Sequence, residues 1–255
     1  MTPLLSVKNL SKNFGGLHAV SHVSFDVQEG AIKALIGPNG AGKTTLFNLI
    51  SGVISPDTGS IIFNGTSVHG FRPHQIALCG MARTFQHIRL FPKMSVLENI
   101  LIGRHIHSRA GFVAGMLGLP FTWDEEKNSK GKSLEIVEFL GLTDLVDSEA
   151  TSLSYGQQRM VELGRALACE PKLLLLDEPA AGLNMQETEE MGSLIVRIRD
   201  SGITVLLVEH DMTLIMGISD EIFVMSYGKK IADDTPIAIQ NNSEVIKVYL
   251  GEDDA

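Results

Sequence analysis

The chain contains little cysteine and no long hydrophobic run, and both absences narrow the class of protein. The two cysteines in its 255 residues, Cys79 and Cys169, cannot build a disulfide framework and indicate a reducing compartment. The N-terminal region lacks a basic start followed by an apolar run, so we expect no signal peptide. The longest weakly charged stretch, 110–123, is too short and too rich in glycine to span a bilayer. We therefore expect a cytoplasmic globular protein that does not itself cross a membrane.

Basic residues are also scarce. The chain has 21 Lys and Arg against 30 Asp and Glu, for a net charge of −9. A protein that binds nucleic acid through its phosphates needs an excess of Lys and Arg, so no nucleic-acid partner is expected. Disorder is excluded for a different reason, because 44% of the residues are hydrophobic and can form a core. The length suits one large domain or two small ones, and no repeat occurs at the periods typical of solenoids.

The pattern of apolar residues predicts an α/β fold. Near 5–7 and 23–27, apolar and polar residues alternate, as in strands with one buried face. Near-continuous apolar runs at 31–36, 173–176 and 203–208 predict strands that are covered on both faces. Because helical segments separate these runs, we expect a mostly parallel sheet, with ligands bound beyond the carboxyl ends of its strands.

The middle of the chain has helical character instead. Ser95 and Ser154 each begin a capping box, in which the serine hydroxyl accepts from a free backbone N–H and a Glu or Gln three residues later bonds back. Each box predicts the start of a helix. The charged, glycine-containing segment 127–132 is expected to be a loop. Residues 87–165 are therefore expected to form a mainly helical insertion between β-rich parts.

Residues 37–44, Gly-Pro-Asn-Gly-Ala-Gly-Lys-Thr, match the phosphate-loop pattern G-x-x-x-x-G-K-[ST]. Its glycines let successive backbone N–H groups point at an anion, and the helix that follows adds the positive end of its dipole. Lys43 would supply a point charge for the β- and γ-phosphates, and the Thr44 hydroxyl would bind Mg²⁺. A glycine-rich turn is the alternative, but the predicted strand before the loop and the helix after it favour nucleotide binding. No Asn-Lys pair occurs in the chain, which counts against the N-K-x-D motif of GTPases.

Two further segments carry groups suited to phosphate chemistry. Asp177 and Glu178 follow the apolar run 173–176, where Asp177 would hold Mg²⁺ and Glu178 would orient or deprotonate an attacking water. The segment Leu-Ser-Tyr-Gly-Gln at 153–157 opens a helix whose free N–H groups can bind an anion. A solvated acidic turn and an ordinary helix cap are the alternatives. The upstream phosphate loop favours the catalytic interpretation of the two carboxylates.

The order of these motifs resembles that of the ATP-binding cassette (ABC) ATPases. The phosphate loop is followed by Gln86 in Arg-Thr-Phe-Gln, then by Leu-Ser-Tyr-Gly-Gln, Leu-Leu-Leu-Leu-Asp-Glu-Pro and His210 in Val-Glu-His-Asp. The resemblance covers about residues 4–251 and implies an α/β P-loop NTPase core with a mostly parallel sheet, an antiparallel β-subdomain and an inserted helical subdomain. It implies a single domain over 1–255, with 1–86 and 166–255 as β-subdomain and RecA-like core and 87–165 as helical subdomain.

The resemblance also implies a site for ATP and Mg²⁺. Its phosphate-loop positions are Gly37, Pro38, Asn39, Gly40, Ala41, Gly42, Lys43, Thr44 and Thr45. Phe14 would stack on adenine and Val20 would line the same face, although a core position is the alternative for Phe14. ABC ATPases work as head-to-tail pairs, so the signature residues Ser154, Gly156 and Gln157 would contact ATP held by the partner.

The implied catalytic residues are Lys43, Gln86, Glu178 and His210, and the implied metal ligands are Thr44, Gln86 and Asp177. Gln86 would touch Mg²⁺ or the attacking water, and His210 would contact the γ-phosphate. Without the other motifs, a loop amide and a structural histidine would be the simpler interpretations. Two positions depart from the family pattern: Tyr155 stands in place of the usual Gly, and Asn184 stands in place of the usual Asp. Asn184 keeps the helix cap and loses the charge.

Longer strings resemble the ATP-binding subunits of branched-chain amino-acid importers. They occupy 83–103, 177–184, 209–220 and 249–252. This resemblance implies membrane-spanning permease subunits as partners, a second ABC ATPase subunit in a heterodimer rather than a homodimer, and, indirectly, a solute-binding protein. It implies a peripheral position at the cytoplasmic face of the inner membrane, with a permease helix docked near 87–91.

The transported solute stays open at this point. Similar subunits serve importers of urea, short amides or other amino acids, and another drives lipopolysaccharide export. A soluble ABC ATPase of DNA repair or translation is a further alternative, but the single phosphate loop and the lack of sustained heptads argue against it. A non-hydrolysing regulatory cassette is disfavoured because Lys43, Asp177, Glu178 and His210 are all present.

Overall fold

The computed structural model describes residues 2–107 and 120–250. Most of the weakly charged segment 110–123 therefore lies outside the described residues. The chain forms two compact units, one of residues 1–83 with 172–255 and one of residues 84–171. The first unit contains the strands of two sheets, and the second is helical.

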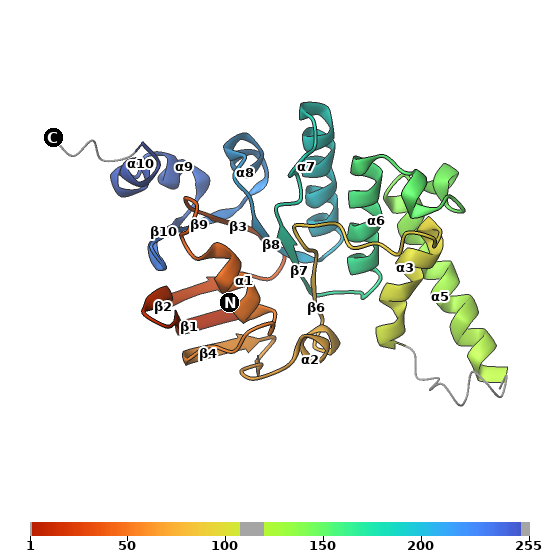
Figure 1. Ribbon diagram of the computed structural model, residues 1–255, viewed down its shortest axis with the longest axis horizontal. Coiled ribbons are helices and arrows are strands. Elements are labelled where there is room, and N and C mark those ends of the chain that lie inside the picture. The colour runs from red at the N-terminus through yellow and green to blue at the C-terminus, as the bar shows by residue number, and fades with distance from the viewer. Residues whose placement is uncertain (1, 108–119, 251–255) are drawn as a thin grey trace. The chain divides into compact units, whose positions relative to one another are not determined.

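A six-stranded sheet forms the centre of the first unit (Figure 1). Its order is β10 (Lys229–Asp234), β9 (Glu221–Ser226), β3 (Ile32–Ile36), β8 (Thr204–Val208), β7 (Leu173–Asp177) and β6 (Met81–Arg83). All neighbours are parallel except β10, which pairs antiparallel with β9. The strands β3, β7 and β8 are buried along their whole length, as expected for apolar runs covered on both faces. The predicted mostly parallel sheet is confirmed.

A second sheet in this unit is antiparallel. Its order is β2 (Leu17–Val27), β1 (Leu5–Phe14), β4 (Thr58–Phe63) and β5 (Thr66–Ser67). The alternation seen in the sequence matches its burial, since Val23 and Val27 are fully buried and Asp26 between them is exposed. The turn between β4 and β5 places Asn64 and Gly65 at positive φ, the backbone that an Asn-Gly turn favours.

The core of the first unit joins both sheets to helix α1 (Lys43–Ile50). Phe47 from α1, Phe63 from β4 and Phe223 from β9 are all fully buried. The rings of Phe25 and Phe223 bring the two sheets together, with centroids 4.7 Å apart. Each such buried side chain stabilises the fold by roughly 1.5–3 kcal/mol, so the loop that precedes α1 is attached to a well-packed body.

The other helices of the first unit are α2 (Pro73–Leu78), α7 (Met185–Asp200), α8 (Met212–Ile218), α9 (Pro236–Gln240) and α10 (Ser243–Leu250). Helix α7 begins at a capping box in which Asn184 accepts from the N–H of Glu187, and it ends before Gly202 at φ +97°. Its start is the segment that follows Asp177 and Glu178, so the cap fixes where that segment ends.

The second unit consists of helices. They are α3 (Val96–Arg104), α5 (Pro120–Phe139), α6 (Tyr155–Leu167) and the 3₁₀ turns His105–His107, Thr143–Leu145 and Ala150–Ser152. Both predicted capping boxes are present: Ser95 pairs with Glu98, and Ser154 pairs with Gln157. The predicted helix starts are thereby confirmed.

The prediction of a loop at 127–132 is wrong, because these residues lie inside α5. Their lysines are good helix formers: Lys127 and Lys130 face solvent, and Lys132 pairs with Glu170. Gly131 has no atom within 4 Å of where a Cβ would stand, so its only cost is the roughly 1 kcal/mol of a helical glycine. Packing of the buried Val137 side chain in the same helix offsets that cost.

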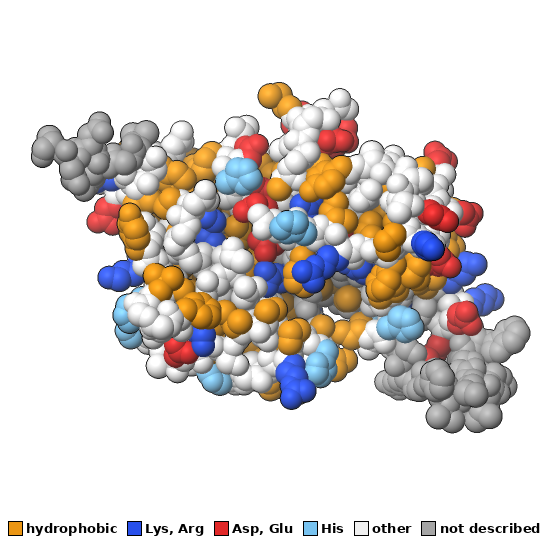
Figure 2. All heavy atoms as spheres, in the orientation of Figure 1, with side chains coloured by type: hydrophobic (Ala, Val, Ile, Leu, Met, Phe, Trp, Pro, Cys, Tyr) orange, Lys and Arg blue, Asp and Glu red, His pale blue; other side chains and the backbone are white. Residues whose placement is uncertain are grey.

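The surface that Figure 2 shows mixes acidic, basic and hydrophobic side chains. Among residues 2–107 and 120–250, none of the helices combines the length and the apolar character that a bilayer span requires. Cys79 and Cys169 are both free thiols, as the sequence predicts.

Candidate active site

Three sequence-predicted segments meet at the carboxyl edge of the six-stranded sheet. The strands β3, β8 and β7 are parallel neighbours, with Leu35 opposite Val208 and Val208 opposite Asp177. The phosphate loop follows β3, His210 follows β8 and Glu178 follows β7. The register therefore brings all three segments to one edge, where parallel sheets bind ligands.

The phosphate loop is packed so closely that two of its glycines cannot be replaced. A Cβ on Gly42, at φ +100°, would lie 2.3 Å from the carbonyl oxygen of Ala19, and one on Gly37 would lie 2.1 Å from that of Met225. The Gly228 N–H donates to the Ala41 carbonyl at 3.0 Å and holds the loop to the β9–β10 turn. The loop is thus a fixed backbone surface that ends at the start of α1.

Lys43 stands over this loop at the first position of α1. Its Nζ donates to the carbonyls of Gly37 at 2.6 Å and Pro38 at 3.1 Å. Burial lowers the pKa of Lys43, and the negative charge of Glu178 opposes that shift. The structure therefore brings Lys43 and Glu178 within electrostatic reach of each other. An ammonium held only by neutral carbonyls can exchange them for phosphate oxygens.

The C-terminal helix contributes a side chain to the same loop. The hydroxyl of Tyr249 forms a hydrogen bond with the backbone of Gly37, and burial raises the pKa of Tyr249 to about 12. Sequence reasoning missed this contact, because Tyr249 and Gly37 are far apart in the chain. A tyrosine hydroxyl seeks a hydrogen-bond partner when its ring is partly buried, and this is the signal that could have suggested the contact.

Asp177 is nearly buried at the end of β7. Arg83 Nη2 lies 2.8 Å from its Oδ2, and Arg83 Nη1 donates to Asn48 Oδ1 and Ser51 Oγ, each at 2.8 Å. The arginine thus ties the carboxylate to helix α1, which begins with Lys43. Sequence reasoning missed Arg83, because the pairing depends on β6 lying next to β7.

Glu178 occupies a strained turn directly after Asp177. Its φ is +50°, a left-handed conformation that costs a non-glycine residue on the order of 1–3 kcal/mol. Its N–H donates to the Val208 carbonyl at 2.9 Å, and its own carbonyl accepts from the Ala181 N–H at 3.1 Å. Strain of this kind persists where surrounding bonds over-determine it, and it is common at active sites.

His210 is 70% exposed as a side chain at the end of β8. Its Nδ1 lies 3.5 Å from Oε2 of Glu209, whose side chain is buried. An exposed imidazole at the ligand-binding edge of the sheet can reach a bound phosphate. Glu209 was not among the predicted site residues, although a carboxylate directly after a buried apolar run is unusual enough to have been noticed.

The two positions predicted to face adenine differ in exposure. Phe14 is 49% exposed at the end of β1, so it is not a core residue, and Lys12 Nζ lies 5.7 Å from its ring centroid. Val20 is fully buried in β2 and belongs to the core of the unit. Val20 therefore offers no exposed surface to adenine, because β2 directs its side chain toward the core.

The signature segment and Gln86 belong to the second unit. Ser154 is exposed and its Oγ accepts from the Gln157 N–H at 3.3 Å, while Gly156 is buried. The buried Arg159 donates to the Gln86 carbonyl at 2.6 Å. The same guanidinium lies 5.5 Å from the ring centroid of Tyr155. Helix α6 and the backbone at Gln86 are therefore tied together by one side chain.

The segment 87–91, predicted to bind a permease helix, lies beside Gln86. Ile88 and Leu90 are half-buried, whereas Phe91 is 48% exposed. Ile88 and Leu90 are therefore partly taken up by packing within the chain, whereas Phe91 keeps an exposed ring.

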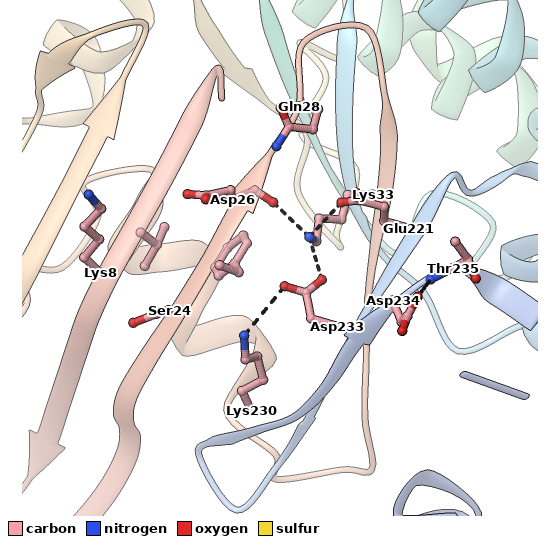
Figure 3. A pocket seen from close by; sticks show the side chains of 12 residues that line it. Lys8, Ser24, Asp26, Gln28, Lys33, Glu221, Lys230, Asp233, Asp234 and Thr235 are labelled. Atoms are coloured by element: carbon pink, nitrogen blue, oxygen red, sulfur yellow. Dashed lines mark hydrogen bonds and ion pairs between the residues drawn. The ribbon is translucent and has the colours of Figure 1, made fainter. Parts of the chain in front are cut away.

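A separate cleft of about 530 Å³ lies near the other end of β3 (Figure 3). Lys33 is buried there, and its Nζ contacts Asp233 Oδ1 at 2.6 Å, Glu221 Oε2 at 2.9 Å and the Asp26 carbonyl at 2.8 Å. Since three partners use all three donors of the ammonium, this lysine joins β2, β3 and the β9–β10 hairpin. It is a structural contact and does not belong to the predicted site.

Comparison with known families agrees with this arrangement. The model of the ABC transporter family matches residues 20–181, which is more than half of the chain. A second model, described as branched-chain amino acid ATP-binding cassette transporter, matches residues 229–255.

Several curated relatives are similar over nearly their whole length. The high-affinity branched-chain amino acid transport ATP-binding protein LivG of Salmonella typhimurium is 44% identical over 98% of both chains. The corresponding protein BraF of Pseudomonas aeruginosa gives the same values. A probable LivG of Archaeoglobus fulgidus is 39% identical over 99% of this chain and 97% of its own.

Solved structures are similar in fold as well. MJ1267, an ATP-binding cassette of an ABC transporter, in its ADP conformation, gives a TM-score of 0.86 at 33% identity over 99% of this chain and 100% of its own. A nucleotide-free ATP-binding cassette from an ABC transporter gives 0.85 at 33% identity, over 98% and 100%. The expected P-loop NTPase fold is confirmed. The chain thus belongs to the ABC transporter family, as one of its ATP-binding, ATP-hydrolysing cassettes.

Proposed function

We propose that this cassette powers a membrane importer of branched-chain amino acids, with hydrolysis carried out at the carboxyl edge of the six-stranded sheet. The observation that carries the site is the register that brings the phosphate loop, Glu178 and His210 to one edge. Support for the solute comes from the names of the relatives and from the family model over 229–255.

The phosphates of ATP would lie on the loop 37–45. Its N–H groups and the start of α1 offer donors and a positive dipole end to an anion. Lys43 would exchange its two carbonyl partners for phosphate oxygens, since a charge-assisted bond is stronger than a neutral one. Phe14, half-exposed at the end of β1, would stack on adenine.

The donors near the loop fit Mg²⁺, which prefers hard oxygen ligands. The Thr44 hydroxyl is exposed at the start of α1, and the Asp177 carboxylate ends β7. With Gln86 these residues would hold the ion, which supplies charge neutralisation for the transferred phosphoryl group. The Arg83 contact fixes the Asp177 carboxylate before any ligand arrives.

Hydrolysis requires an oriented water and a neutralised γ-phosphate. Glu178 would orient or deprotonate the water, and the turn at φ +50° fixes where its side chain begins. His210 would contact the γ-phosphate from the end of β8 and Lys43 from the loop. Ser154, Gly156 and Gln157 would complete the site of a second cassette, so the active state requires a pair of cassettes.

The partners we propose are membrane-spanning permease subunits and a second, similar ATPase in a heterodimer, with a solute-binding protein acting through the permease. The chain would act at the cytoplasmic face of the inner membrane. The exposed Phe91 and the half-buried Ile88 and Leu90 offer an apolar surface to a permease helix.

The test is transport by the assembled complex. The tagged chain is purified with its subunits from detergent-solubilised membranes of its host and reconstituted in liposomes with the matching solute-binding protein. We expect ATP-driven uptake of labelled leucine, isoleucine and valine, and none when the complex carries Glu178→Gln. Uptake of urea or short amides instead would overturn the proposal that branched-chain amino acids are the solute. Absence of membrane subunits from the purified complex would overturn the proposed transport function.

A further inference from the structure

The end of β8 contains a buried carboxylate that the proposed mechanism does not use. The Glu209 side chain is 1% exposed. Its Oε1 accepts from the Ala180 N–H at 2.8 Å, and its Oε2 accepts from the His210 N–H at 2.9 Å. We call this arrangement the Glu209 bridge, because one side chain joins the segment after β7 to the segment after β8.

Burial of a carboxylate is costly unless charges or hydrogen bonds compensate it. Within residues 2–107 and 120–250, the ion-pair partner of Glu209 within 4.0 Å is the exposed His210, at 3.5 Å. The buried compensation comes instead from two backbone N–H donors, which form charge-assisted bonds with an acceptor. Packing alone does not explain a charge here, since an apolar side chain would fill the space without that cost.

The two donors belong to the segments that carry Glu178 and His210, two of the predicted catalytic residues of this edge. Ala180 lies two residues after Glu178, in the turn closed by the Ala181 N–H. The Glu178 N–H is itself bonded to the Val208 carbonyl, one residue before Glu209. The strained turn of Glu178 is therefore held by the Val208 carbonyl before it and by the Glu209 carboxylate after it. The Glu209 carboxylate also fixes the backbone of His210.

We propose that Glu209 is a positioning residue that sets the placement of Glu178 relative to His210. The inference rests on the proposed roles of these two residues. Each carboxylate oxygen holds one turn, so a shift of His210 toward a phosphate is passed to the turn of Glu178. Loss of either bond frees one turn, and a misplacement of about 1 Å in an active site can cost as much as 100-fold in rate.

Two substitutions of Glu209 distinguish the loss of one backbone hydrogen bond from the loss of both. Glu209→Gln keeps one oxygen acceptor and presents an amide N–H₂ to the other backbone donor, so one bond is lost. We expect kcat for ATP hydrolysis to fall roughly 10-fold in Glu209→Gln and roughly 100-fold in Glu209→Ala, with KM for ATP changed less than about threefold. Hydrolysis is measured on the tagged full-length chain with the subunits that it retains.

Asp233→Asn is the matched control. Asp233 is a largely buried carboxylate of the same unit that contacts Lys33 in the cleft of Figure 3, away from the phosphate loop. This variant tests what a lost carboxylate does to stability alone. We expect the melting temperature to fall similarly in Asp233→Asn and Glu209→Gln, while kcat falls only in Glu209→Gln.

A double variant tests whether Glu209 acts through His210. If it does, Glu209→Gln lowers kcat less in a His210→Ala background than in the unmodified chain, because contributions of coupled residues are not additive. Equal fold-changes in the two backgrounds, or a Glu209→Gln variant with the kcat of Asp233→Asn, would overturn the inference. Normal turnover by Glu178→Gln would overturn the proposed site instead, so the two failures are distinguishable.

Discussion

One lysine lies near the start of strand β3 and another lies beyond its end, at the first position of α1. The comparison of the two explains which end of the strand suits a nucleotide. Lys33, near the start of the strand, contacts two carboxylates and a carbonyl, which satisfy all its donors. Lys43, beyond the end of the strand, donates to two carbonyls of its own loop. A lysine neutralised by carboxylates stabilises the fold, whereas a lysine held by neutral groups keeps its charge for an anion.

The backbone also differs between the two ends of β3, and this difference again favours anion binding beyond the carboxyl end. Around Lys33 the chain is regular strand, and the residues from Lys33 to Ile36 pair with β9. Beyond Ile36 the loop turns through Gly40 and Gly42 at positive φ and enters the start of a helix, where N–H groups are free. Binding of phosphate needs a cation that can exchange its partners and N–H donors that point at one place, and the phosphate loop with the start of α1 offers both at the carboxyl end of β3.

The largest expected effect is a loss of ATP hydrolysis while ATP binding is retained. We expect Glu178→Gln to lower ATP hydrolysis roughly 10²- to 10⁴-fold, because it removes the group that orients or deprotonates water. ATP affinity should stay within a few-fold, since the loop and Lys43 are untouched. Phosphate release and nucleotide binding are measured on the same preparations, and hydrolysis at the normal rate would refute the role of Glu178.

Lys43→Met should have the next largest effect. Loss of the loop ammonium removes a charge-assisted contact with phosphate, so we expect ATP affinity to fall roughly 100-fold. The melting temperature should change little, because the bonds lost are two neutral carbonyl contacts of a partly exposed side chain. Calorimetric titration with a non-hydrolysable ATP analogue measures the affinity, and unaltered binding would contradict the comparison.

Lys33→Met should show the opposite pattern. We expect the free energy of unfolding to fall by about 1–3 kcal/mol, because Asp233 and Glu221 lose their contacts with the buried ammonium, although Asp233 keeps Lys230 at 3.8 Å. ATP affinity and hydrolysis should be retained by the folded protein. Denaturant unfolding provides the measurement, and Lys8→Met, a change of an exposed lysine at the same cleft, should stay within about 0.5 kcal/mol. A lower ATP affinity in Lys33→Met would show that the two ends are not independent.

The smallest effect compares two helix caps. Asn184→Ala at the start of α7 and Ser95→Ala at the start of α3 should each cost about 1 kcal/mol of stability, since each removes a side chain that accepts from a free N–H. Only the first follows the Glu178 turn, so only Asn184→Ala should also reduce kcat, by a few-fold. Equal activity in the two variants would limit the influence of this cap to stability.

Much of the fold was predictable because its signals are local. The buried strands came from short apolar runs, the helix starts at Ser95 and Ser154 from four-residue capping boxes, and the phosphate loop from eight contiguous residues. Such patterns need no knowledge of distant parts of the chain. The segment 127–132 shows the limit, since its charges and glycine suggested a loop while packing elsewhere in α5 kept it helical.

The supporting contacts of the site could not be predicted in the same way. The Glu209 bridge joins residues 29 positions apart, and the Arg83–Asp177 pair joins residues 94 positions apart. Both depend on which strands become neighbours in the sheet, and no short motif encodes that. The burial of Val20 likewise follows from how β2 packs on the core, which its position in the sequence alone did not show.

Amide hydrogen exchange with and without Mg-ATP tests the central claim most directly, using the Glu178→Gln chain so that the nucleotide stays intact. The account predicts slower exchange of the amides in 37–45 and unchanged exchange at Asp233 and Asp234, the part of β10 that lines the cleft around Lys33. Protection of these two amides with no change in the phosphate loop would contradict it.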